Sequence, residues 1–204
     1  MYTLYYAPGS AAMAPHAALE EIGAPYRLVA VDLTRPRDPA YLALNPDGWV
    51  PVLIDENGVM HESAAIVLYL ADRHPEAALA PATDDRLRGA YLQWLLYMAG
   101  VLQIAYQLHY YPERHSAGPA AAVQAKAAER LARAWGRLDG VLAAAGPYLL
   151  GERFSACDLY LHMLAGWHPE PERLARECPA VTACAERVAA RPAVRRVLAA
   201  HGVA

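Results

Sequence analysis

Cysteine is scarce in this chain, and the spacing of the few thiols excludes several classes of protein. The 204 residues include three cysteines, an odd number, and no two of them form a C-x-x-C pair. That pattern excludes a disulfide framework and a paired-cysteine zinc site. The first residues also lack a charged stretch followed by an apolar run and a small-residue cleavage site. We therefore expect a reducing compartment, the cytoplasm.

Lysine is scarcer still, because Lys126 is the single lysine among 18 basic residues. Any cationic contact to a carboxylate of a ligand would therefore come from arginine or histidine. The 21 acidic residues bring the net charge to −3, and nothing in the charge pattern suggests a nucleic-acid surface or a polybasic membrane anchor. The sequence also lacks a metal-ligand cluster and a phosphate-binding glycine loop, so we expect no metal.

One long uncharged stretch, residues 89–112, raises the question of a membrane span, since it is long enough to cross a bilayer. Gln93, Gln103, Gln107 and His109 would be costly in lipid, and the apolar residues have the helical spacing of a buried bundle helix. The sequence therefore predicts a buried helix in a soluble protein, with no membrane partner.

The chain is organised around residues 45–66, which predict a β-hairpin followed by a helix. Val52, Leu53 and Ile54 are strand formers, and Asn57-Gly58 is the dipeptide typical of a two-residue type I′ turn. Residues 59–61 supply the return strand. Ser63 then occupies the expected N-cap position, ahead of apolar residues at helical spacing.

Two features of this stretch suggest a ligand. Pro51 lacks an N–H where an interior strand needs one, and a cis Val50-Pro51 bond would turn the backbone of Val50 outward to pair with an extended peptide. Ser63 and the free N–H groups of its helix could hold a carboxylate, while Glu62 could hold an ammonium group. Together they would fit an α-amino acid head. The alternative is that Ser63 only caps its helix and Glu62 is a solvated charge.

The remaining chain divides into two parts. Residues 2–6 and 26–31 read as strands and residues 11–22 as the helix between them, an order that implies parallel pairing. Beyond the linker 77–83, strand patterns do not recur. We therefore expect one domain over 1–76 and an all-helical domain over 84–204.

The helical domain should contain two long helices and a capping box. The expected helices run from 84 to about 109 and from 119 to 145, antiparallel as in a bundle. Ser155-Ala-Cys-Asp158 has the spacing of a capping box with Asp replacing Glu. Cys157 lies inside this helix start and reads as a small core residue rather than a nucleophile.

Four features together resemble the glutathione S-transferase superfamily. They are the Val50-Pro51 pair, the Glu62-Ser63 pair that follows after ten intervening residues, the tyrosine-rich first strand and Ala7-Pro8-Gly9-Ser10. The resemblance covers the full chain and is nearest to bacterial beta-class-like members. It implies an α+β fold of two domains, a thioredoxin-like βαβαββα domain followed by an all-α helical bundle. It also implies a homodimer and a cytoplasmic role in detoxification.

The same resemblance implies the residues that bind glutathione, the expected co-substrate. The backbone of Val50, before Pro51, would pair with the cysteinyl part, and Glu62 and Ser63 would hold the γ-glutamyl head. Arg35, on a polar loop, could reach the glycyl carboxylate.

Ser10 is the candidate activator of the glutathione thiol, as both catalytic and binding residue. It follows Pro-Gly at a strand-to-helix turn, and a matching serine activates the thiol in insect-type transferases. In the beta class a cysteine lies one residue later, where this chain has Ala11, and a beta-class histidine is replaced here by Gln103. The alternative hydroxyls are those of Tyr5, Tyr6, Tyr106, Tyr110 and Tyr111.

These residues favour an enzyme that conjugates the glutathione thiolate to a hydrophobic electrophile, with Tyr106 and Tyr110 facing the electrophile. The main alternative is a non-catalytic or regulatory glutathione-binding protein with the same fold. A disulfide reductase is disfavoured because the first domain has no cysteine. His16 has no Ser or Cys partner at usable spacing, so we assign it no role.

Overall fold

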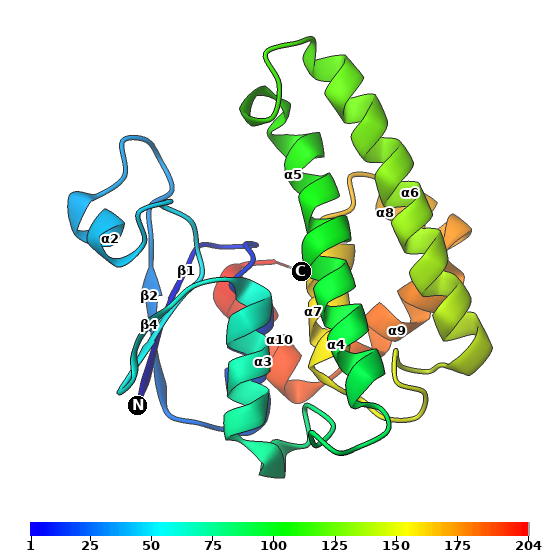
Figure 1. The fold of residues 1–204 in the computed structure, drawn as a ribbon, viewed down its shortest axis with the longest axis horizontal. Coiled ribbons are helices and arrows are strands. Elements are labelled where there is room, and N and C mark those ends of the chain that lie inside the picture. The colour runs from blue at the N-terminus through cyan, green and yellow to red at the C-terminus, as the bar shows by residue number, and fades with distance from the viewer. Residues whose placement is uncertain (204) are drawn as a thin grey trace. The chain divides into compact units, whose positions relative to one another are not determined.

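The computed structural model describes residues 1–203, which fall into two compact units (Figure 1). The first unit combines Met1–Ala82 with the segment that begins at Ala189, and Thr83–Val188 forms the second. The predicted thioredoxin-like βαβαββα order, followed by helices, is confirmed. The units differ from the domain limits proposed from the sequence in one respect. The last helix groups with the first unit because its apolar face packs on the first helix.

The sheet of the first unit has four strands in the order β2-β1-β3-β4. They are β1 (Tyr2–Tyr6), β2 (Tyr26–Ala30), β3 (Val52–Asp55) and β4 (Gly58–Met60). Strands β1 and β2 are parallel, as the helical crossover between them predicts, while β3 pairs antiparallel with both β1 and β4. The central strand β1 is therefore hydrogen-bonded on both sides.

Four α-helices accompany this sheet: α1 (Met13–Ile22), α2 (Pro39–Leu44), α3 (Ser63–Arg73) and α10 (Pro192–His201). Figure 1 shows α2 on one side of the sheet and α3 on the other. Helix α1 packs against both α3 and α10. Leu4 of β1 is fully buried in the core of this unit.

The predicted hairpin forms, but its turn differs by one residue from the prediction. Asp55 pairs with Gly58, so Glu56 and Asn57 are the central residues, and Gly58 already belongs to β4. The Asn57 N–H donates to Asp55 Oδ1 at 2.8 Å, and Asn57 does not have the positive φ that a type I′ turn requires. The Asp55 side chain therefore sets the turn, and the type I′ prediction was wrong.

The second unit consists mainly of helices. Its elements are α4 (Arg88–Tyr97), the π-helical stretch η2 (Met98–Gln103), α5 (Ile104–Tyr110), the short turn η3 (Pro112–Arg114), α6 (Ala120–Ala145), α7 (Ala156–Ala165), α8 (Pro171–Glu177) and α9 (Pro179–Ala189). The two long predicted helices thus correspond to the α4-η2-α5 run and to α6. No helix among residues 1–203 has the length and apolar character needed to span a membrane.

The capping box at the start of α7 is confirmed. Asp158 Oδ2 accepts a hydrogen bond from the Ser155 N–H at 2.8 Å, and Oδ1 accepts one from the Leu149 N–H at 2.9 Å. Cys157 is fully buried beside it, and burial raises the pKa of its thiol well above the usual value. The core role predicted for Cys157 agrees with this burial.

Candidate functional site

Ser10 lies in the turn between β1 and α1, which begins two residues later than the sequence predicts. Its hydroxyl donates to the Ala7 carbonyl at 2.7 Å and accepts from the Ala12 N–H at 3.3 Å. The Ser10 N–H also bonds the Ala7 carbonyl, at 3.2 Å. A hydroxyl has one proton, so Ser10 must turn away from Ala7 before it can donate to a thiolate.

The Val50-Pro51 peptide bond is cis, as the sequence predicts. The backbone before it is held by α2 and its flanks, because the Trp49 carbonyl accepts from Tyr41 Oη at 2.5 Å and from Asn45 Nδ2 at 2.8 Å. The sheet ladder begins at Val52, so the peptide of Val50 lies outside it.

Helix α3 begins one residue earlier than the sequence predicts. Glu62 is the N-cap residue and is exposed, with φ +68° and ψ +109°, while Ser63 is the first helical residue and is 3 % exposed. A positive φ is strained for any residue with a Cβ, and such strain persists where function requires it. The N-cap prediction for Ser63 was wrong because this turn places Glu62 outside the helix.

The strand register brings these segments to one end of the sheet. Tyr5 lies opposite Val52 on the antiparallel pair, so the end of β1, which leads to Ser10, lies beside the residues that precede β3. Ser63 Oγ donates to the Ala11 carbonyl at 2.6 Å and so ties the start of α3 to the same turn. The Ser10 turn, the cis-proline segment and the N-terminus of α3 therefore converge.

Arg35 takes part in none of the contacts that bring this cluster together. It is exposed on the loop before α2 and lines a hollow of about 510 Å³ together with Pro36, Arg37, Leu42, Pro46 and Asp47. None of the cluster residues lines that hollow. The assignment of Arg35 to a carboxylate of the ligand stays a prediction.

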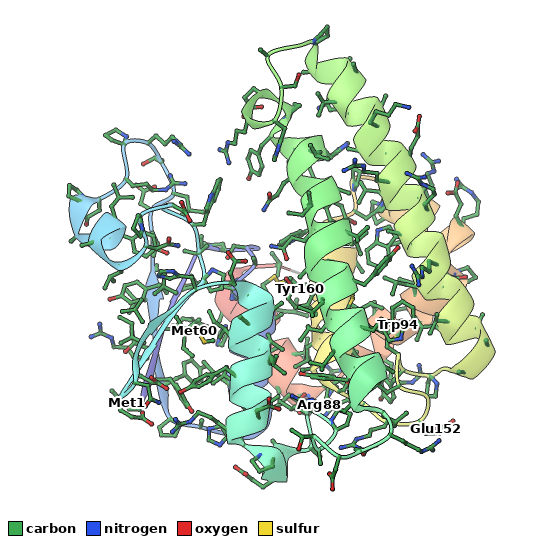
Figure 2. The ribbon with its side chains drawn as sticks, in the orientation of Figure 1. Met1, Met60, Arg88, Trp94, Glu152 and Tyr160 are labelled. Carbon is green, nitrogen blue, oxygen red and sulfur yellow. The ribbon has the colours of Figure 1, made fainter. Side chains whose placement is uncertain are left out.

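The tyrosines predicted to face the electrophile are engaged within the second unit. Tyr106 is 1 % exposed, its Oη accepts from Trp135 Nε1 at 3.0 Å, and burial raises its pKa. Tyr110 stacks on Tyr106 and donates to the Trp167 carbonyl at 2.5 Å. Tyr160, labelled in Figure 2, donates to Oε1 of Gln103. Tyr106 is therefore a poor source of a free hydroxyl, and its place in a pocket stays a prediction.

Sequence reasoning missed the groups that hold the cis-proline segment. Tyr41 and Asn45 are 5 % and 4 % exposed, and Arg37 Nε donates to the Gly48 carbonyl at 2.9 Å. A signal for Asn45 was available, because asparagine before proline at the end of a helix is a frequent turn former. Tyr41 gave no such signal.

The chain matches two family models, the N-terminal domain of glutathione S-transferase over residues 4–78 and the C-terminal domain over residues 103–201. It is 35% identical to glutathione S-transferase 3 of Zea mays, covering 89% of this chain and 86% of that protein. A sphingomonad glutathione S-transferase solved with glutathione is 34% identical, with a TM-score of 0.84 over 99% of this chain and 100% of that one. The beta-class enzyme of Sphingomonas chungbukensis is 31% identical, with a TM-score of 0.85 over 99% and 100% of the two chains.

The chain therefore belongs to the glutathione S-transferase superfamily. Within it, the chain is a bacterial member, as the sequence predicts. Ala11 stands at the position where the resemblance to the beta class would place a cysteine.

Proposed function

We propose that this protein binds glutathione at the end of the sheet formed by Ser10, Val50 and the Glu62-Ser63 pair, and transfers its thiolate to an apolar electrophile. The observation that carries the proposal is the exposed, strained Glu62 at the N-terminus of α3, next to the Ser10 turn. A related sphingomonad structure described as complexed with glutathione supports it.

In this proposal the γ-glutamyl head lies over the N-terminus of α3. Its carboxylate accepts from the N–H of Ser63, where the helix dipole favours negative charge, and from the Ser63 hydroxyl, which must turn from the Ala11 carbonyl to reach it. Its ammonium group pairs with Glu62. The cysteinyl backbone pairs with Val50, and Arg35 receives the glycyl carboxylate. The sulfur then lies toward Ser10.

Catalysis requires a thiolate, and a free thiol with a pKa near ~8.5 is only a few per cent ionised at neutral pH. The N-terminal amides of α1 and the Ser10 hydroxyl are the groups that would stabilise the charged sulfur. The thiolate attacks the electrophile and forms a C–S bond as the leaving group departs, or as a double bond accepts the electron pair.

Ser10→Ala should lower turnover near pH 7 while leaving glutathione affinity almost unchanged, because the hydroxyl acts on the ionised sulfur. Each unit by which the pKa of the bound thiol rises reduces its ionised fraction at neutral pH by about tenfold. The measurement is the ultraviolet thiolate absorbance of the glutathione complex against pH, alongside conjugation of a chlorinated aromatic. Ser116→Ala, on an exposed loop, is the matched control. Identical titration curves in wild type and Ser10→Ala would remove Ser10 from the mechanism.

A glutathione-binding protein without catalysis is the second candidate. Two observations favour it: the Ser10 proton is directed at Ala7, and Ala11 provides no thiol. Conjugation by purified protein at no more than the uncatalysed rate, with binding intact, would select this candidate. The three cysteines are unpaired and buried, which supports a reducing cytoplasmic location but not disulfide reductase chemistry.

We propose a homodimer, supported by the exposed apolar side chains of Leu96, Val101 and Ile104 along the α4-η2-α5 run. Sedimentation should give twice the chain mass of 22.2 kDa at micromolar protein. Val101→Glu should shift the mass toward the monomer, whereas Ala175→Glu on exposed α8 should not. A monomer mass for the wild type would contradict the proposal.

A further inference from the structure

A chain of polar side chains, two buried histidines followed by two half-buried residues, links α1, β2 and α10 in the first unit. His16 Nδ1 lies 3.2 Å from His201 Nε2, and His16 Nε2 lies 2.7 Å from Tyr26 Oη. The Tyr26 hydroxyl in turn donates to Oε1 of Glu20. His16 and His201 are 1 % and 2 % exposed. They are in contact although 185 residues separate them in the sequence.

The hydrogen bonds restrict where the protons lie when both imidazoles are neutral. Tyr26 has one proton, which goes to the Glu20 carboxylate, so Tyr26 must accept from Nε2–H of His16. His16 Nδ1 then carries a lone pair and accepts from Nε2–H of His201. His201 Nδ1 is left as a buried acceptor without a hydrogen-bond partner. A neutral pair therefore carries its protons at Nε2 of both rings, and a further proton would go to His201 Nδ1, beside the Ala7 backbone.

His201 also forms the back of the turn that carries Ser10. Its ring packs edge-on against Tyr6, with centroids 4.9 Å apart, and the Ala7 backbone lies close enough to raise its pKa. The Ala7 carbonyl is the acceptor of the Ser10 hydroxyl. Val203, two residues after His201, approaches Gly9 of the same turn. Its Cγ1 lies 3.8 Å from the point where a Cβ on Gly9 would stand. The end of α10 thus supports the Ala7–Ser10 turn directly.

The charged groups around the two imidazoles are already paired with one another. On α1, Glu20 accepts from Arg196 Nε at 2.5 Å, and Glu21 forms a two-pronged pair with Arg191 at 2.6 and 2.8 Å. Tyr26 is the titratable group that faces them from β2, and Tyr6 contributes its ring from β1. Glu20 favours a charge on His16, but burial outweighs it.

We propose that His201 is a positioning residue for the Ser10 turn, which it supports through its contacts with Tyr6 and Ala7, and that it holds the turn only while its own imidazole and that of His16 are neutral. The link to turnover rests on the proposed transferase function, whereas the link to the turn itself does not. A neutral pair keeps α10 docked on α1. Protonation places a charge and an extra donor in a buried site and favours release of α10.

The direction of the pH dependence follows from burial, which lowers the pKa of both His16 and His201 to about 4. Since an exposed histidine has a pKa of about 6.5, the released state binds protons more tightly than the docked state. The docked state is therefore fully favoured above about pH 6.5 and loses stability as the pH falls from there toward 4.

The test is hydrogen exchange of the α10 and Ala7–Ala12 amides against pH, with protection corrected for the intrinsic exchange rate. In wild type, protection of both segments should fall together, approaching about a hundredfold per pH unit below pH 6 because two histidines take up protons. His201→Gln keeps a donor to His16 and removes one titrating group, so the fall should approach about tenfold per unit. Equal slopes in the two proteins, or loss of α10 protection without loss in the turn, would overturn the proposal.

Two further readouts keep the proposal testable if His201→Gln folds poorly. Nitrogen-15 spectra of wild type should show both histidines as neutral Nε2–H tautomers at pH 7, and a charged or Nδ1–H imidazole would overturn the assignment. If the protein catalyses conjugation, kcat of wild type should fall more steeply than kcat of His201→Gln as the pH is lowered from 6.5 to 5. KM for glutathione should change little. If exchange follows expectation and conjugation is absent, the transferase function fails and the positioning role stands.

Discussion

Replacing Asp158 with alanine should lower the free energy of unfolding by about 3 to 5 kcal/mol, because a buried charged acceptor with several partners is removed. The side chain is fully buried and accepts from the N–H groups of Leu149 and Ser155 at 2.9 and 2.8 Å. Both donors would remain buried without an acceptor, and the cap of α7 would be lost.

Urea unfolding followed by tryptophan fluorescence measures this change. The matched control is Asp84→Ala, since Asp84 is exposed at the start of the second unit and should change stability by less than about 0.5 kcal/mol. A loss below 1 kcal/mol for Asp158→Ala would show that the box does not stabilise the unit.

Glu62→Ala and Ser63→Ala should weaken glutathione binding by several-fold to a hundredfold, since each removes a partner of a charged group worth about 1.5 to 3 kcal/mol. Calorimetric titration measures the affinity. Ser63→Ala also deprives the Ala11 carbonyl of its donor and should cost about 1 kcal/mol of stability. Glu56→Ala, an exposed carboxylate paired with Arg73, is the control for charge alone.

Glu62→Gly separates binding from folding at the same position. Glycine adopts a positive φ without strain, so this variant should be more stable than wild type by about 1 kcal/mol while losing affinity as Glu62→Ala does. Unchanged affinity in all three variants would remove the N-terminus of α3 from the proposed glutathione site.

The parts of the fold that the sequence predicted are those set by nearby residues. The cis-proline segment, the hairpin and the capping box each depend on residues within a few positions of one another, where side-chain type restricts the backbone directly. Ser10 and the Glu62-Ser63 pair were predicted as site residues in the same way, with help from the family resemblance.

The parts that the sequence did not predict depend on distant partners or on small shifts. Asp55 moved the hairpin turn by one residue, and the strained φ of Glu62 moved the start of α3. His16 had no evident partner because His201 lies 185 residues away, and no local periodicity reports such a pair. For the same reason the sequence did not show that the last helix packs on α1.

The return of α10 to the first unit has a consequence for synthesis on the ribosome. Chains are made from the N-terminus, and domains usually fold in that order. Here the sheet is translated first, yet the unit that contains it lacks Val194, Val197 and His201, all buried, until α10 has emerged. The second unit, Thr83–Val188, is a continuous stretch and has all of its residues earlier. The unit that begins first is therefore the one completed last.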